Sequence, residues 1–146
     1  AMPFMLAQLI VAGLDAGRYH WSGQFPPWLQ ALGVVICCTG MLISGWALRV
    51  NRFFSPVVRI QSERGHHLIT GGPYRIIRHP GYLGTLLGSP GISIAFGSWW
   101  SMLPLIPLSM LLFRRLLIED RYLKEHLDGY AQYAERVRYR LIPGIW

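Results

Sequence analysis

Long uncharged, apolar segments alternate along the chain with short basic ones. The clearest apolar segment runs from Trp28 to Leu48, where 21 residues carry no charge. As an α-helix this segment would be about 31 Å long, which matches the roughly 30 Å hydrocarbon core of a membrane. Arg49 and Arg52 follow it with positive charge. We therefore predict a transmembrane helix over residues 28–48.

A second uncharged segment extends for 33 residues, from Gly81 to Phe113. A single helix of that length would measure about 50 Å, which exceeds the core of a membrane. Glycine, serine and tryptophan gather at residues 97–101. We therefore expect a hairpin of two spans that turns near 97–101, with Trp99 and Trp100 at the membrane surface.

The first apolar segment is shorter. Residues 3–14 would cover only about 18 Å as a helix, so they predict a partial span or a helix that starts inside the membrane. The polar segment 49–80 begins with apolar side chains that we expect to anchor it at the membrane surface. These are Phe53, Phe54, Val57, Val58 and Ile60.

From Arg114 the helical pattern continues but becomes amphipathic. Its apolar side consists of Leu116, Leu117, Leu123 and Leu127. We expect Gly129 to end or bend this helix, and residues 130–139 to start another. The pattern as a whole predicts an all-α, polytopic membrane protein with about four transmembrane helices and a cytosolic, C-terminal amphipathic helix.

Composition and charge support a membrane protein. Apolar residues make up 52% of the chain and charged residues 14%, against roughly 25% charged in soluble domains. The net charge is +7, with six arginines in 49–78 and seven arginines or lysines in 114–140. These positive charges border apolar segments and form no single basic face, which argues against nucleic-acid binding. They suit anionic membrane lipids and place both charged segments at the cytoplasmic face.

Two groups of residues could carry chemistry. Arg115 and Glu119 are four residues apart on one helix, and form either a simple surface ion pair or a site for a charged ligand at the membrane edge. His79 precedes Pro80, which suits the first turn of a helix whose free amides could bind an anion. In the alternative interpretation His79 only caps that helix and Arg78 touches a lipid phosphate.

Metal chemistry is not expected. Cys37 and Cys38 are adjacent within an apolar segment, where we interpret them as small apolar side chains. No cysteine and histidine cluster has zinc spacing. Histidines in a polar loop, such as His66 and His67, are more often exposed to solvent than bound to a ligand.

Three separated motifs nevertheless occur in order. The first is His66-x-Leu68-Ile69-Thr70-x-Gly72-Pro73-Tyr74, and the second is Arg78-His79-Pro80-x-Tyr82-x-Gly84. The third is Arg115-x-x-x-Glu119-Asp120-x-x-Leu123, followed by Tyr130-x-x-Tyr133. Together they resemble the isoprenylcysteine carboxyl methyltransferase family of membrane enzymes, and related phospholipid N-methyltransferases share much of the pattern. Asp120 stands where the family usually has a second glutamate.

The resemblance implies an integral membrane methyltransferase that moves a methyl group from S-adenosylmethionine to a lipid-like acceptor, in particular a carboxylate. It implies a single membrane domain over 1–146, with N-terminal spans in 1–54 and a cofactor-binding catalytic core in 55–146. Arg115 would position the acceptor and Glu119 would meet the amino-acid end of the cofactor. The other residues implied to line the cofactor are His66, His67, Leu68, Ile69, Tyr74, His79, Pro80, Gly81 and Tyr82, with Arg59 as a further contact.

Three alternatives remain open at this point. One is a phospholipid N-methyltransferase, and another is an NADPH-dependent membrane oxidoreductase of the sterol-reductase type. The reductases tend to have asparagine after the His-Pro pair and an acid further on, where this chain has Gly81 and Thr85. The third alternative is a membrane scaffold without catalytic activity.

Overall fold

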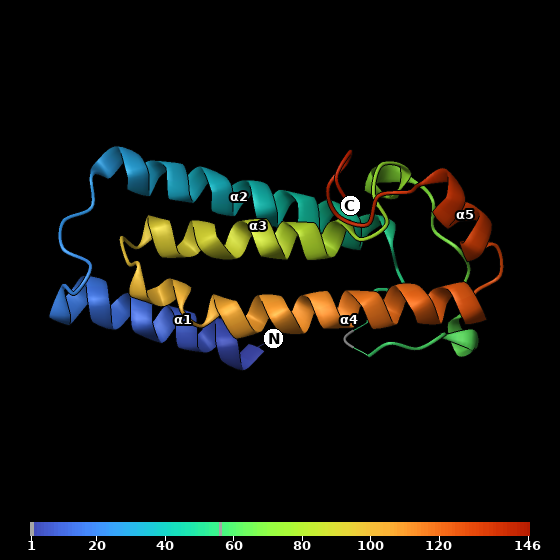
Figure 1. Cartoon of the computed structure of the whole chain (residues 1–146), viewed down its shortest axis with the longest axis horizontal. Helices are drawn as coiled ribbons and strands as arrows, with labels where there is room; N and C mark the ends of the chain where they lie inside the picture. The colour runs from blue at the N-terminus through green and yellow to red at the C-terminus, as the bar shows by residue number, and fades with distance from the viewer. Residues whose placement is uncertain (1, 56) are drawn as a thin grey trace. The chain divides into compact units, whose positions relative to one another are not determined.

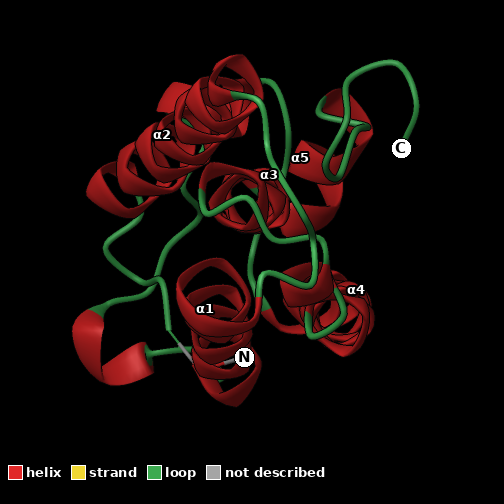
Figure 2. Ribbon diagram, turned by 90° about the vertical axis from the view of Figure 1, so that its left-hand side faces the viewer, coloured by secondary structure: helices red, strands yellow, loops and turns green. Residues whose placement is uncertain are grey.

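The computed structural model describes residues 2–55 and 57–146, and these residues form only helices, turns and loops (Figure 2). The all-α prediction is therefore confirmed for the described chain. The longer α-helices are α1 (Met2–Leu14), α2 (Pro27–Val50), α3 (Pro80–Ala95), α4 (Leu105–His126) and α5 (Tyr130–Arg136). Short helical turns are η1 (Asp15–Tyr19), η2 (Ser62–Arg64), η3 (Gly72–Arg75) and η4 (Trp100–Met102).

The chain divides into two compact units. The first contains residues 1–42 and 84–113, and the second contains residues 43–83 and 114–146. Each of the helices α2, α3 and α4 is divided between the two units, with one end in the first and the other end in the second. We describe each unit by itself, and the predicted division of the chain at residue 54 stays a prediction.

Small residues bring α2 and α3 together in the first unit, where the two helices run side by side (Figures 1 and 2). A Cβ atom added to Gly40 would lie 2.5 Å from the carbonyl oxygen of Gly84, and one added to Gly33 would lie 2.4 Å from the backbone of Ala95. Neither position has room for a side chain. Close backbone approach of this kind is how membrane helices gain packing contacts.

Two buried polar side chains tie the rest of the first unit together. Gln8 of α1 donates hydrogen bonds to the carbonyl of Ser89 (2.6 Å) and to the hydroxyl of Ser93 (3.0 Å). Asp15, in η1, accepts hydrogen bonds from the hydroxyls of Ser22 (2.5 Å) and Ser98 (2.6 Å). These bonds satisfy the amide nitrogen of Gln8 and the carboxylate of Asp15, which would be costly to bury unpaired, whereas the Oε1 atom of Gln8 is buried without a hydrogen-bond partner among the described residues.

Two helices among the described residues are long and apolar enough to cross a membrane, Pro27–Val50 and Trp100–His126. Only 17% of the apolar window of the first is buried, whereas the core helix of a soluble protein would be mostly buried. α1 and α3 have 13 and 16 residues, short of the roughly 20 that a span needs. The structure therefore supports two spans by this measure, and the expected number of about four is not confirmed.

Most of the predicted helix starts and turns agree with the structure, but α5 ends at Arg136, three residues before the predicted end at Tyr139. α3 begins at Pro80, and the chain turns between Ala95 and Leu105, where we expected the hairpin. α4 continues through the charged residues that follow Phe113, so the amphipathic segment extends this helix instead of forming a separate one. Gly129 has a positive φ of 78° and separates α4 from α5.

Candidate functional site

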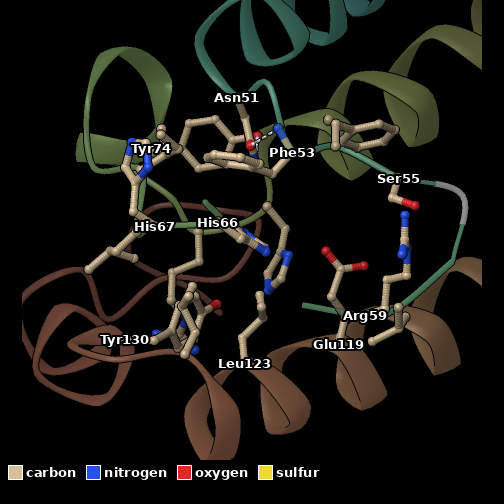
Figure 3. Close-up of a pocket in the computed structure, with 18 of the residues that line it drawn as sticks. Asn51, Phe53, Ser55, Arg59, His66, His67, Tyr74, Glu119, Leu123 and Tyr130 are labelled. Atoms are coloured by element: carbon tan, nitrogen blue, oxygen red, sulfur yellow. Dashed lines mark hydrogen bonds between the residues drawn. The ribbon is translucent and has the colours of Figure 1, made fainter. Parts of the chain in front are cut away.

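Three stretches of the second unit line one cavity (Figure 3): the loop after α2, the segment from His66 to Tyr82, and the sides of α4 and α5. Figure 3 shows Glu119 and Leu123 pointing from one helix toward this cavity, with Asn51 and Phe53 on its opposite side. The space free of protein atoms is about 750 Å³ with the open mouth included.

A tight turn brings the first two motifs to the cavity. Gly72 opens η3 with a positive φ of 56°, and a Cβ atom there would lie 2.8 Å from the side chain of Val50. Glycine is therefore required both for the backbone conformation and for the contact with α2. The turn buries Tyr74, and α3 then starts at Pro80 with Tyr82 in its first turn.

Aromatic side chains form one wall. Phe53 is buried and stacks on His66 with ring centroids 4.4 Å apart, and its ring lies edge-on to His67 at 5.0 Å. The Nδ1 atom of His66 accepts a hydrogen bond from the backbone N–H of Gln61 at 3.3 Å. Burial, together with the neighbouring His67, lowers the pKa of His66, which favours the neutral ring. Its proton then lies on Nε2, which can act as a hydrogen-bond donor.

Glu119 is the acid of the cavity. Its side chain is 24% exposed, and its Oε2 atom accepts a hydrogen bond from the hydroxyl of Tyr82 at 2.6 Å. Arg115, one turn earlier, has its Nε atom 3.9 Å from the same oxygen, while its Nη2 atom donates to the carbonyl of Ser55 at 2.7 Å. The Nε atom of Arg115 is buried without a hydrogen-bond partner among the described residues.

The next residue, Asp120, lies in a different environment. Its side chain is 3% exposed and forms ion pairs with Arg78 (2.9 Å) and Arg140 (3.0 Å). It also accepts a hydrogen bond from the hydroxyl of Tyr130 at 3.0 Å, and its Oδ1 atom lies 3.4 Å from Nε2 of His79. This carboxylate joins α4 to the residues just before α3, to α5 and to the C-terminal residues of the second unit.

Arg78 shows why this cluster is structural. Its side chain is 4% exposed, and its Nη1 atom also donates to the carbonyls of Val137 (2.8 Å) and Arg138 (3.0 Å). The backbone N–H groups of Arg78 and His79 donate to the carbonyls of Tyr139 and Arg140. The interpretation of Arg78 as a contact to lipid phosphate is therefore wrong, because its guanidinium is buried inside the protein.

Two tyrosines complete the cavity from α5. Tyr130 and Tyr133 pack with Leu127 into a buried cluster, and the hydroxyl of Tyr133 donates to the carbonyl of Tyr74 at 2.7 Å. Burial raises the pKa of both tyrosines, so both remain neutral phenols. Tyr133 thereby fixes α5 against the turn at Tyr74, whereas the hydroxyl of Tyr130 fixes α5 to Asp120 of α4.

The structure gathers most of the residues that the sequence singled out. Nine of the ten residues expected at the cofactor line the cavity, and Arg59 does so as well. Pro80 is fully buried and does not line the cavity, and Arg115 does not line it either. The nine are His66, His67, Leu68, Ile69, Tyr74, His79, Gly81, Tyr82 and Glu119. Their individual roles stay predictions.

Other lining residues were not identified from the sequence. Phe53 was expected at the membrane surface, but it is 8% exposed and lines the cavity. Phe54 and Val57 also line the cavity and are 46% and 61% exposed. Tyr130 and Tyr133 are three residues apart after the third motif and line the cavity, although neither was expected there. That spacing, which puts both on one side of a helix, was the available signal.

Comparison with known proteins identifies the family. The family model described as phospholipid methyltransferase matches residues 28–129. The protein-S-isoprenylcysteine O-methyltransferase B of Arabidopsis thaliana is 29% identical over 123 residues, which cover 82% of this chain and 59% of that protein. A probable protein-S-isoprenylcysteine O-methyltransferase of Oryza sativa subsp. indica is 32% identical over 112 residues, which cover 73% of this chain and 57% of that protein.

A solved structure has the same fold. It is that of a eukaryotic intramembrane Ras methyltransferase, an isoprenylcysteine carboxyl methyltransferase, and it matches with a TM-score of 0.73 at 24% identity. The match covers 99% of this chain and 52% of the other. The chain thus spans somewhat more than half the length of these relatives. Since the family model matches well over half of its residues, the chain belongs to the phospholipid methyltransferase family.

Proposed function

We propose that the protein is an integral membrane methyltransferase that uses S-adenosylmethionine to methylate a lipid-like acceptor at the cytoplasmic face of its membrane. One observation carries this proposal: the carboxylate of Glu119 reaches a cavity lined by the residues between His66 and Tyr82. Two motifs about forty residues apart in sequence thus contribute to one site. The six arginines of 49–78 support the cytoplasmic orientation.

The chemistry of the lining fits this cofactor. Glu119 offers a carboxylate for the ammonium of its amino-acid end, held in place by the hydroxyl of Tyr82. Phe53, His66 and Tyr74 offer aromatic surfaces for a flat purine ring. When bound, S-adenosylmethionine would supply a methyl group on a positively charged sulfur, and its transfer to a carboxylate oxygen would give a methyl ester.

The residues of the chain would contribute mainly alignment and charge. An in-line displacement depends on holding donor and acceptor close together in a site that excludes water. Arg115 suits an acceptor carboxylate, because its buried Nε–H has no hydrogen-bond partner among the described residues and lies beside Glu119. An acceptor with a carboxylate and an apolar tail could accept a hydrogen bond from the Nε–H of Arg115 and place its tail in the membrane.

Binding of S-adenosylhomocysteine, measured by calorimetry in detergent, tests the site. We expect the wild type to bind it saturably and Glu119→Gln to bind about 30-fold or more weakly, because a charge-assisted hydrogen bond is lost in a partly enclosed site. NADPH in place of S-adenosylhomocysteine should give no binding. Equal affinity of wild type and variant would exclude Glu119 from the site, and binding of NADPH alone would favour a reductase.

Amine methylation is the second candidate, because the family model is described as phospholipid methyltransferase. A labelled-methyl assay separates the two. An S-prenylated cysteine derivative with a free carboxyl group should yield a base-labile methyl ester. Phosphatidylethanolamine should remain unlabelled, and its labelling in place of the cysteine derivative would reverse the order of the two candidates.

A further inference from the structure

A second, basic pocket lies in the same unit as the candidate site and shares a wall with it. Its lining consists of Val50, Arg52, Phe53, Arg64, His67 and Ile69, around a space of about 940 Å³ with the open mouth included. Phe53, His67 and Ile69 line both spaces. No acidic residue lines the basic pocket, although it contains two arginines and a histidine. The proposed methyl transfer assigns no role to either arginine.

The charge of the basic pocket is not neutralised within the described part of the chain. The nearest acid in sequence, Glu63, forms an ion pair with Arg59 at 2.8 Å. The guanidinium of Arg64 bonds to an uncharged amide, the Oε1 atom of Gln61, at 2.7 Å. The side chain of Arg52 has no hydrogen bond or ion pair to any residue that the structure describes, and both arginines are exposed. Two positive charges therefore face the pocket without a counter-ion.

Arg64 is held in a defined position. Gln61 is 2% exposed, and its Nε2 atom donates to the carbonyl of Phe53 at 2.6 Å while its Oε1 atom accepts from Arg64. The guanidinium of Arg64 also lies over the ring of Phe53, 6.0 Å from its centroid, within range of a cation–π contact. A buried amide thus orients the cation, which lowers the entropy lost when a ligand binds.

The chemistry and position of the basic pocket point to a lipid phosphate. Guanidinium groups match the geometry of phosphate oxygens, and Val50, Phe53 and Ile69 provide an apolar side for the glycerol and the first part of an acyl chain. Val50 is the last residue of α2, a helix long and apolar enough to cross a membrane, so the pocket lies at the level of the headgroups. We propose that this pocket binds the phosphate of an anionic membrane phospholipid, at a place distinct from the methyl-transfer cavity.

The test uses native mass spectrometry on the full chain, stripped of lipid in detergent and titrated with phosphatidylglycerol. The wild type should retain one lipid, and the double variant Arg52→Gln/Arg64→Gln should bind it about tenfold or more weakly, because both cations that attract the lipid phosphate are removed. Arg52→Gln alone should show part of this loss. Since the side chain of Arg52 has no hydrogen bond or ion pair to any described residue, the unfolding temperature of Arg52→Gln should match that of the wild type.

Two controls decide the interpretation. Arg136→Gln removes the same charge from an exposed position on α5 and should leave lipid binding unchanged. If Arg136→Gln lost as much lipid affinity as Arg52→Gln, the lipid would be attracted by net charge alone, and the proposal would be overturned. Inorganic phosphate at the concentration of the lipid should not displace it, since it lacks the apolar contacts. Displacement of the lipid by inorganic phosphate would assign the pocket to free phosphate. Unchanged lipid binding by the double variant would also contradict the proposal.

Discussion

Glu119 and Asp120 are consecutive acids on α4, yet they belong to two different regions of the second unit. Glu119 is 24% exposed and accepts its closest hydrogen bond from the hydroxyl of Tyr82, at 2.6 Å. Asp120 is 3% exposed and lies among Arg78, Arg140 and Tyr130. The first carboxylate has capacity left for a ligand, whereas the second is fully occupied by the protein.

The geometry of a helix explains the difference. Consecutive side chains diverge by about 100° around the helix axis, so the two neighbouring carboxylates point in different directions. Asp120 has a short side chain that stays within the ion-pair cluster, and Glu119 has a longer one that reaches the cavity. We therefore expect Glu119 to serve ligand binding and Asp120 to serve the structure of the second unit.

The largest effect is expected on the structural side. Asp120→Asn keeps the shape but removes the charge that balances Arg78, whose side chain is 4% exposed. Leaving a buried charge unpaired typically costs about 3–5 kcal/mol, so we expect a marked loss of stability. The measurement is the midpoint of thermal unfolding in detergent.

Glu119→Gln is the matched control in that experiment. Because Glu119 is partly exposed and its closest partner is an uncharged phenol, its loss should change stability by less than about 1 kcal/mol. Similar midpoints for the two variants would contradict the division of roles between the neighbouring acids.

Much of the fold follows from the sequence because its signals are local. Pro80 starts α3 and Gly129 separates α4 from α5, as proline and glycine chemistry requires. The hairpin near 97–101 follows from an apolar segment too long for one span. The number of spans was harder to predict, because a helix of 16 residues such as α3 lies between a span and a shorter membrane segment.

The candidate site was predictable only in part. The motifs identified Glu119 and His79, because their residue types are unusual next to apolar segments. The burial of Arg78 was not predictable, since its partners Asp120, Val137 and Arg138 are about 40 to 60 residues away in sequence. For the same reason the inward position of Phe53 depends on tertiary packing that no local pattern reports.

A smaller effect is expected from the hydrogen bond that orients Glu119. Tyr82→Phe removes the hydroxyl that donates to Oε2 and keeps the ring. We expect S-adenosylhomocysteine to bind about fivefold more weakly, in line with the roughly 1 kcal/mol of one hydrogen bond. Calorimetry measures the affinity, and thermal unfolding should remain close to that of the wild type.

Tyr133→Phe provides the comparison for Tyr82→Phe. The hydroxyl of Tyr133 donates to the carbonyl of Tyr74, which is a bond within the protein. This variant should lose stability more than affinity. A loss of affinity in Tyr133→Phe as large as that in Tyr82→Phe would show that the Tyr82 hydroxyl has no special role at Glu119.

The smallest effect is expected in the pH dependence of folding stability, through His66 at the cavity wall. Burial lowers the pKa of His66 from 6.5, so the folded state binds fewer protons than the unfolded state near that pH. The stability that neutral His66 contributes is fully present above about pH 6.5 and is lost as the pH falls through that value toward the lower pKa of the folded state. Protonation of Nδ1 would also break its hydrogen bond with the N–H of Gln61.

His66→Asn separates this contribution from other titrating groups. Asparagine keeps an acceptor for the N–H of Gln61 but does not titrate. Unfolding midpoints measured from neutral pH to about pH 5 should fall more steeply for the wild type than for His66→Asn. Parallel curves would mean that the proton on His66 does not affect folding, and the lowered pKa would then have no consequence for the cavity wall. A steeper fall in the wild type would instead show that protonation of His66, the ring that packs on Phe53, destabilises the fold in acid.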